Sequence, residues 1–285
     1  IGFYILLVTL GVNPWLAIGG AIAYALSTYF FIIIEVGHNS KTMALALLPP
    51  VVAGVLLVFR QKYLIGSAIL AFFLPLSLIA NHVQMTYYFF ITIGIYGLIE
   101  LIQAMKTMRF ISYLKSVGIL AIIGILAVGS NFTLLWMTNE YGKYSTRSKS
   151  ELTLNKEVQT SGLDKDYATD WSYGISETFT FLIPNFAGNS SQSDLGTESE
   201  IYKQLRNMGV GNAREIAGNA PTYWGSQPFT EGPFYMGAIV VFLFVLGIFF
   251  VEGPFKWWLV TATALSILLG WGKNFMALSD IFLDY

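Results

Sequence analysis

The chain has 285 residues, of which 55% are hydrophobic and 12% are charged, whereas a soluble domain carries about 25% charged residues. This deficit excludes a nucleic-acid-binding protein, a disordered protein and an ordinary cytosolic enzyme. The formal net charge of −1 identifies no partner, and the lack of cysteine excludes disulfides and Cys-ligated metals. Residues 137–231 hold 8 of the 16 Lys and Arg residues and 12 of the 17 Asp and Glu residues. The remainder of the chain is therefore predicted to lie in a lipid bilayer.

Apolar runs close to the length that a membrane-spanning helix needs, about 20 residues, recur along the chain. These runs are Trp15–Ile34, Thr42–Phe59, Tyr63–Ala80, Met85–Met105, Val117–Met137, Gly232–Val251 and Trp257–Gly272. Residues Ile1–Val12 have the character of the end of an eighth helix, so we expect the chain to be an internal fragment of a longer protein. Lipid permits only helices or closed barrels, and these runs are too continuous for barrel strands. The predicted fold is an all-α polytopic bundle of about eight spans, the first of them truncated.

Polar turns separate the apolar runs, and their Lys and Arg residues predict the orientation, because positive charge in short loops favours the cytoplasm. If the turns alternate sides, one set carries Arg60, Lys62, Lys106, Arg109, Lys115 and Lys256. The other set carries only Lys41 and Lys273. We therefore predict transmembrane helices in residues 1–136 and 232–285, and an extracytoplasmic loop of mixed structure in residues 137–231.

Within this outer loop, Glu198–Asn207 is predicted to form a short amphipathic helix that ends before Gly209. Residues 177–186 are apolar but too short to span a membrane, which suits a re-entrant or interfacial element. The loop also carries aromatic residues that either stack on sugar faces or mark the membrane interface. These are Trp171, Tyr173, Tyr223 and Trp224.

Two turns on the predicted outer side carry candidate binding residues. In the first turn, Glu35–Lys41, His38 and Asn39 offer hydrogen bonds and Lys41 offers a point charge for a phosphate or a sugar. The alternative is a solvated turn in which Ser40 caps the following helix.

The second turn supplies Asn81, His82 and Gln84, with Tyr87 one helical turn further on. Contact with a sugar or phosphate and helix capping are both compatible with these residues. A metal site is the third alternative, with candidate ligands Glu35, His38, His82 and Asp280. Because their spacing is not a metal signature, no metal is predicted. Lys273 and Asn274 fall on the same predicted side.

Five segments resemble the YfhO family of bacterial membrane proteins, in the same order. They are EVGHNSK (35–41), ANHVQMTYY (80–88), EYGKYSTRSKSELT (140–153), SGLDKDYATDWSYGISETFTFLIPNF (161–186) and YWGSQPFTEGPFYMGAI (223–239). YfhO proteins are similar to glycosyltransferases of the GT-C architecture. The resemblance implies a plasma-membrane enzyme whose partners are the bilayer, a polyprenyl-phosphate-linked sugar donor and an envelope polymer, lipid or protein acceptor. It implies no cofactor.

The resemblance also implies where the catalytic groups lie. In GT-C proteins the catalytic acidic residue follows the first spanning helix, which places it before Ile1, so Glu35 and Glu177 are fallback acids here. The two turns, the aromatic residues of the loop and the pair Lys273 and Asn274 together supply the implied substrate-binding residues. These are His38, Asn39, Lys41, Asn81, His82, Gln84, Tyr87, Trp171, Tyr173, Trp224, Lys273 and Asn274.

Two alternatives accompany the glycosyltransferase hypothesis. A transporter or flippase for a lipid-linked saccharide is expected to carry ionisable residues in mid-membrane, broken helices and internal repeats. The predicted spans are nearly free of charge and show no convincing repeat, which favours the enzyme. The second alternative is a non-catalytic membrane protein of envelope assembly.

Overall fold

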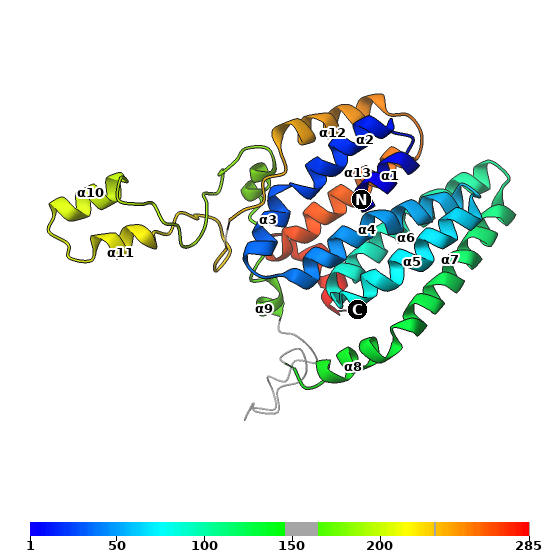
Figure 1. The fold of residues 1–285 in the computed structure, drawn as a ribbon, viewed down its shortest axis with the longest axis horizontal. Helices are drawn as coiled ribbons and strands as arrows, with labels where there is room; N and C mark the ends of the chain where they lie inside the picture. Colours follow the sequence, from blue (N-terminus) through cyan, green and yellow to red (C-terminus); the bar gives the residue numbers. More distant parts are fainter. Residues whose placement is uncertain (146–164, 231, 285) are drawn as a thin grey trace. The chain divides into compact units, whose positions relative to one another are not determined.

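The computed structural model describes residues 1–145, 165–230 and 232–284, and these residues fold mainly into helices (Figure 1). Among them, the only backbone bridges outside the helices are the isolated pairs Gly188–Tyr223 and Ser193–Ala220. The predicted all-α class is therefore confirmed. Residues 146–164 and 231 of the predicted outer loop, with parts of the segments at 140–153 and 161–186, lie outside the described residues.

Four helical stretches in the described part are long and apolar enough to cross a membrane. They are α2 and α3 taken together, α4, α6 and α7, which cover Pro14–Glu35, Asn39–Phe59, Val83–Lys106 and Phe110–Ser130. Further apolar helices are α1, α5, α12 and α13, which cover Gly2–Thr9, Tyr63–Ile79, Ala238–Phe250 and Phe255–Gly270. The helices have the composition of a membrane protein, and the number of spans stays a prediction.

The first long stretch is divided between α2 (Pro14–Ala25) and α3 (Thr28–Glu35). Asn13 caps α2, because its side chain accepts a hydrogen bond from the Trp15 amide at 2.9 Å. Pro14 occupies the first helical position, where its missing N–H costs nothing. The backbone turns extended at Ser27, which interrupts the predicted run Trp15–Ile34.

The predicted run Val117–Met137 differs from the structure at both ends. Helix α7 begins at Phe110, seven residues earlier, because its polar residues find partners within the helix and on its neighbours. The Ser116 hydroxyl donates to the Ser112 and Val58 carbonyl oxygens at 3.1 Å. The Lys115 ammonium lies over the Tyr63 ring, 4.6 Å from its centre.

At its other end, α7 stops at Ser130 and a separate helix, α8, covers Phe132–Gly142. Asn131 lies at the junction, and its amide donates to the Ala127 carbonyl oxygen at 2.9 Å and to that of Pro75 at 3.3 Å. A side chain that bonds to the last turn of α7 thus divides the apolar run.

The predicted run Gly232–Val251 is also too long at its start. Gly232 has a φ of 141° and Gly237 a φ of 113°, a region that glycine adopts readily and a helix does not use. Helix α12 consequently begins at Ala238 and has 13 residues, fewer than the roughly 20 that a membrane-spanning helix needs.

The described residues divide into two compact units. The first unit consists of the described residues of Ile1–Leu163 and of Phe250–Thr263. The second unit consists of the described residues of Asp164–Phe249 and of Ala264–Tyr285. Most of the predicted outer loop therefore shares a unit with the C-terminal residues, and α13 contributes to both units.

In the first unit, helices α4 and α5 pack closely as an antiparallel pair. Gly54 and Gly66 face each other: a Cβ atom on Gly66 would lie 2.9 Å from the Gly54 carbonyl oxygen and 2.8 Å from a Val58 methyl group. Small residues of this kind let membrane helices approach. The core around the pair includes Val51, Leu56, Val58, Leu70, Leu74, Phe89, Tyr96, Ile123, Ala127 and Trp258.

Side-chain hydrogen bonds to backbone carbonyl groups connect other helices of this unit. The Trp258 indole N–H donates to the Thr92 carbonyl oxygen at 2.7 Å, which joins α13 to α6. The Tyr24 hydroxyl donates to the Leu45 carbonyl oxygen at 2.9 Å, which joins α2 to α4. Such bonds contribute about 1 kcal/mol each between membrane helices.

Large apolar side chains remain exposed on the outer faces of the long helices. On α7, Ile122, Ile125 and Leu126 are 60%, 71% and 65% exposed. On α5, Leu64 is 86% exposed. Monomeric soluble proteins rarely leave contiguous apolar surface of this kind in water, so these faces are suited to contact lipid chains.

The second unit contains short helices connected by long loops. These are α9 (Lys165–Thr169), the 3₁₀-helices η2 (Ser176–Phe181) and η3 (Gly272–Phe275), α10 (Glu200–Asn207), α11 (Ala213–Gly218) and α14 (Met276–Asp284). The predicted amphipathic helix is confirmed as α10. Ser199 caps it by accepting a hydrogen bond from the Tyr202 amide at 3.3 Å, and Gly209 follows with a φ of 75°.

Candidate functional site

The two predicted polar turns lie at the same end of the first unit. Helices α4 and α5 run antiparallel and are joined by residues 60–62 at one end. The start of α4, which follows the first turn, and the end of α5, which precedes the second, therefore both lie at the opposite end (Figure 1). The structure agrees with the predicted alternation of turns for this pair of helices.

In the first turn, the chain leaves α3 at Glu35 and enters α4 at Asn39. His38, not Ser40, is the capping residue, and its side chain makes no capping bond. The side chains of Glu35, His38 and Asn39 are exposed. Lys41 is partly buried, with its ammonium 5.1 Å from the centre of the Tyr29 ring. The turn therefore presents a carboxylate, an imidazole and an amide to the outside, with a cation held near them.

In the second turn, the capping alternative applies to His82. Its Nδ1 atom accepts a hydrogen bond from the Met85 amide at 3.4 Å, at the start of α6. The Asn81 amide donates to the Thr138 hydroxyl at 3.0 Å, so it connects this turn to α8. Gln84 and Tyr87 are exposed. The shared binding role of the two turns stays a prediction.

The opposite end of the first unit gathers the basic turns. The Arg60 guanidinium donates to the Thr9 carbonyl oxygen at the end of α1. Lys106 at the end of α6 and Lys256 at the start of α13 line one groove. With the packing of Lys115 on Tyr63, these contacts come from the ends of six helices. Most basic side chains of the first unit thus lie at one end of α4 and α5, and the two polar turns, with Lys41, lie at the other.

In the second unit, Glu177 is the most deeply placed carboxylate among the described residues, with 3% of its surface exposed. Its side chain accepts hydrogen bonds from the Tyr223 hydroxyl and, at 2.5 Å, from the Gly174 amide. Tyr223 in turn accepts a bond from the Gln227 amide at 3.1 Å. Partial burial, and then the bond to Glu177, raise the pKa of Tyr223 above its usual value, so the phenol stays protonated and donates.

Three further predicted residues lie where the segment that precedes Glu177 meets η3. The Asn274 amide donates to the Tyr173 carbonyl oxygen at 2.8 Å, and the Tyr173 amide donates to the Gly270 carbonyl oxygen at 2.9 Å. The Lys273 backbone amide donates to the Ser172 hydroxyl at 2.9 Å, while its side chain is exposed. Tyr173, Lys273 and Asn274 are therefore brought together.

The two predicted tryptophans lie at the surface of the same unit. Trp171 is 41% exposed and donates to the Phe229 carbonyl oxygen at 3.3 Å. Trp224 is 70% exposed and donates to the Phe186 carbonyl oxygen at 3.3 Å. Each indole thus has a fixed polar edge and an accessible ring, an arrangement compatible with both stacking on a sugar and contact with the membrane interface.

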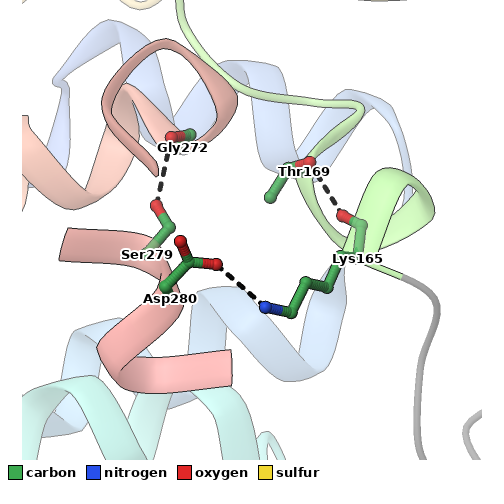
Figure 2. Close-up of polar contacts among 5 residues, drawn as sticks. All are labelled: Lys165, Thr169, Gly272, Ser279 and Asp280. Atoms are coloured by element: carbon green, nitrogen blue, oxygen red, sulfur yellow. Dashed lines mark hydrogen bonds and ion pairs between the residues drawn. The ribbon is translucent and has the colours of Figure 1, made fainter. Parts of the chain in front are cut away.

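A contact that the sequence did not predict joins α9 to α14. The Lys165 ammonium lies 2.9 Å from a carboxylate oxygen of Asp280, a candidate metal ligand in the sequence (Figure 2). Both side chains are nearly half exposed. In the same view the Ser279 hydroxyl donates to the Gly272 carbonyl oxygen at 3.1 Å. Across residues 1–145, 165–230 and 232–284, no three His, Cys, Asp or Glu side chains form a cluster that would hold a metal ion.

The partnership of Glu177 and Tyr223 was also missed, although both residues were singled out. The two residues are 46 positions apart, and no periodic pattern joins them. Both residues lie in segments that contain glycine and aromatic residues, GISETF and YWGS. Gly225 in the second segment is the feature of the sequence that could have indicated this close contact. A Cβ atom on Gly225 would overlap the Glu177 carboxylate and the Tyr223 ring.

The described residues form membrane-type helices, and each of their two units carries a group of polar residues. Comparison with protein-family models, with curated proteins and with solved structures found no match to the chain.

Proposed function

We propose that this protein is a GT-C-like membrane glycosyltransferase. It would take a sugar from a polyprenyl-phosphate donor and pass it to a cell-envelope acceptor at the outer face of a bacterial plasma membrane. The proposal rests on the resemblance of five segments to the YfhO family. The observation that supports it most is the segregation of polar side chains: His38, Asn39, Lys41 and His82 lie at one end of α4 and α5, opposite the basic turns.

The reaction defines what these residues must do. An acceptor hydroxyl oxygen attacks the anomeric carbon, the bond from that carbon to the phosphate oxygen breaks, and the polyprenyl phosphate leaves with the electron pair. A carboxylate takes the proton of the acceptor, and cations or hydrogen-bond donors stabilise the leaving phosphate. Lys41 and His38 have the chemistry for the second role.

The two fallback acids differ in their suitability as the base. Glu177 is buried and both its oxygens accept tight hydrogen bonds, so we assign it a positioning role in the second unit. Glu35 is exposed at the end of α3, in the same turn as His38 and Lys41. Of the two, Glu35 is therefore the one that an acceptor can reach.

The test is a sugar-transfer assay with the full-length protein in membranes and a radiolabelled polyprenyl-phosphate sugar as donor. Lys41→Ala is expected to reduce transfer about 10- to 100-fold, because a hydrogen bond to a charged group contributes roughly 1.5–3 kcal/mol. Lys41→Arg is expected to retain part of the activity, since the charge persists while the head geometry changes.

Lys203→Gln on α10 is the matched control. This lysine is exposed and paired with Glu200, so its loss removes the same charge from α10 instead of from the turn. Transfer by Lys41→Gln at the wild-type rate would remove Lys41 from the proposed site. Movement of the donor across the bilayer without transfer to any acceptor would replace the enzyme with the flippase alternative.

A further inference from the structure

A groove at the basic end of the first unit is not accounted for by sugar transfer. It lies between the end of α6 and the turn that leads into α13, and its volume is about 680 Å³. This volume is within the range of small-molecule sites, about 300–1,000 Å³. The lining residues are Ile99, Ile102, Gln103, Lys106, Glu252, Gly253, Pro254, Lys256 and Trp257.

The polar part of the groove favours an anion. Lys106 and Lys256 approach it from two helices, Gln103 adds an amide, and Glu252 is the one acidic residue in the lining. The same end of the unit carries Arg60, Lys62, Arg109 and Lys115, so cations outnumber Glu252 and the nearby Glu100. Glu100 already accepts a hydrogen bond from the Tyr96 hydroxyl at 2.7 Å.

The other wall of the groove is apolar and faces outward. Ile102 is 45% exposed and Trp257 is 55% exposed. The Lys256 ammonium lies 5.4 Å from the centre of the Trp257 ring, so a cation and an aromatic surface adjoin. Tryptophan is enriched where hydrocarbon meets lipid headgroups, and α6 is long enough to cross the membrane.

We propose that this groove binds an anionic phospholipid from the adjoining leaflet. The phosphate lies between Lys106 and Lys256 and accepts a hydrogen bond from Gln103. The acyl chains run along Ile99, Ile102 and Trp257. Basic pockets between membrane helices on the cytoplasmic side are known to bind acidic headgroups in this way, and a free phosphate would leave the apolar wall uncovered. The site is separate from the polar turns proposed for sugar transfer.

The experiment measures retained lipid by native mass spectrometry of the full-length protein in detergent. The protein is mixed with phosphatidylglycerol or with phosphatidylcholine, and a third sample receives glycerol 3-phosphate alone. The wild-type protein is expected to retain phosphatidylglycerol at least ten-fold more strongly than phosphatidylcholine. Lys106→Gln with Lys256→Gln is expected to weaken that retention by about 10- to 100-fold, from the usual strength of charged hydrogen bonds.

Two control variants separate lipid binding from loss of fold or charge. Lys203→Gln with Arg206→Gln removes the same charge from α10 and is expected to leave retention unchanged. Lys106→Arg with Lys256→Arg keeps the charge and is expected to keep most of the binding. Equal retention by the wild type and the groove variant, or equal retention of the two lipids by the wild type, would overturn the proposal. Retention of glycerol 3-phosphate as strong as that of the lipid would overturn the role of the apolar wall. None of these outcomes bears on sugar transfer.

Discussion

Gly225, which has no side chain, determines how the second unit holds the buried carboxyl group of Glu177. The carboxylate of Glu177 approaches the backbone at Gly225 so closely that a Cβ atom there would overlap both the carboxylate and the Tyr223 ring. The same carboxylate receives the Tyr223 hydroxyl and the Gly174 amide. A buried carboxyl group is tolerated only when it is hydrogen-bonded in this way.

The consequence can be measured with Gly225→Ala. The added methyl group must displace Glu177 or Tyr223, and overpacking of this kind costs about 1–3 kcal/mol. We expect a lower temperature of thermal unfolding, followed in detergent by the fluorescence of the tryptophans. Gly211→Ala is the matched control, because a Cβ atom there meets nothing within 4 Å. Equal unfolding temperatures for the two variants would contradict the close approach.

At the scale of elements, the pair α4–α5 depends on two glycines rather than on large apolar side chains alone. Gly54 and Gly66 allow the backbones to approach until a Cβ atom would reach the opposite carbonyl oxygen. In lipid, where apolar burial gives little gain between helices, close packing of this kind is a main source of association.

We therefore expect Gly66→Leu to separate α4 from α5 and to lower resistance to unfolding by SDS in mixed micelles, by about 1–3 kcal/mol or more. Gly94→Leu in α6 is the comparison, since Gly94 is exposed and a Cβ atom there has no neighbour within 4 Å. That change should be neutral or slightly stabilising, because leucine favours a helix more than glycine does. A Gly66→Leu protein as stable as Gly94→Leu would show that the pair does not need the glycines.

The elements also show what the sequence can predict. Apolar runs predicted helices in the right places, because composition alone determines what lipid tolerates. The predicted helix boundaries were wrong where a polar residue contacts a partner elsewhere in the fold. Lys115 lies over the Tyr63 ring, and Ser116 bonds to the Val58 carbonyl oxygen. The predicted apolar run included Gly232 and Gly237, whose backbone conformations are not helical. It therefore began before α12, which starts at Ala238.

The candidate site was predictable only in part. The turns were recognised from their residue types, and the ends at which they lie follow from the short connection between α4 and α5. The contacts of Asn81 with Thr138 and of Glu177 with Tyr223 span 57 and 46 residues. Contacts at such separations depend on the whole fold, and no local pattern predicts them.

At the scale of the whole molecule, the orientation in the membrane is the open prediction with the widest consequence. The chain has no cysteine, so single cysteines report their own positions. Gln192 is exposed in the second unit, and Met108 is 93% exposed in the turn after α6. The Lys and Arg bias predicts the first outside the cell and the second inside.

A membrane-impermeant thiol reagent should therefore label Gln192→Cys in intact cells and Met108→Cys only after the cells are permeabilised. Labelling both variants with a permeant reagent controls for reactivity. The reverse pattern would invert the topology and would place the turns that contain His38 and His82 in the cytoplasm. Sugar transfer at the outer face would then have to be abandoned.

The hydrogen bond between Trp258 and Thr92 has a consequence for how the protein is synthesised and inserted into the membrane. Its two residues are separated by 166 positions, and the first unit includes Phe250–Thr263 although the second unit intervenes in the chain. At a synthesis rate of 5–20 residues per second, the ribosome needs roughly 10–30 s to pass from one residue to the other. During that interval Thr92 has already been synthesised, whereas Trp258, which donates the hydrogen bond, has not. A nascent chain of this protein must therefore wait in the bilayer with the α6 face uncovered, and factors that shield apolar or polar surfaces during insertion have their longest opportunity to act there.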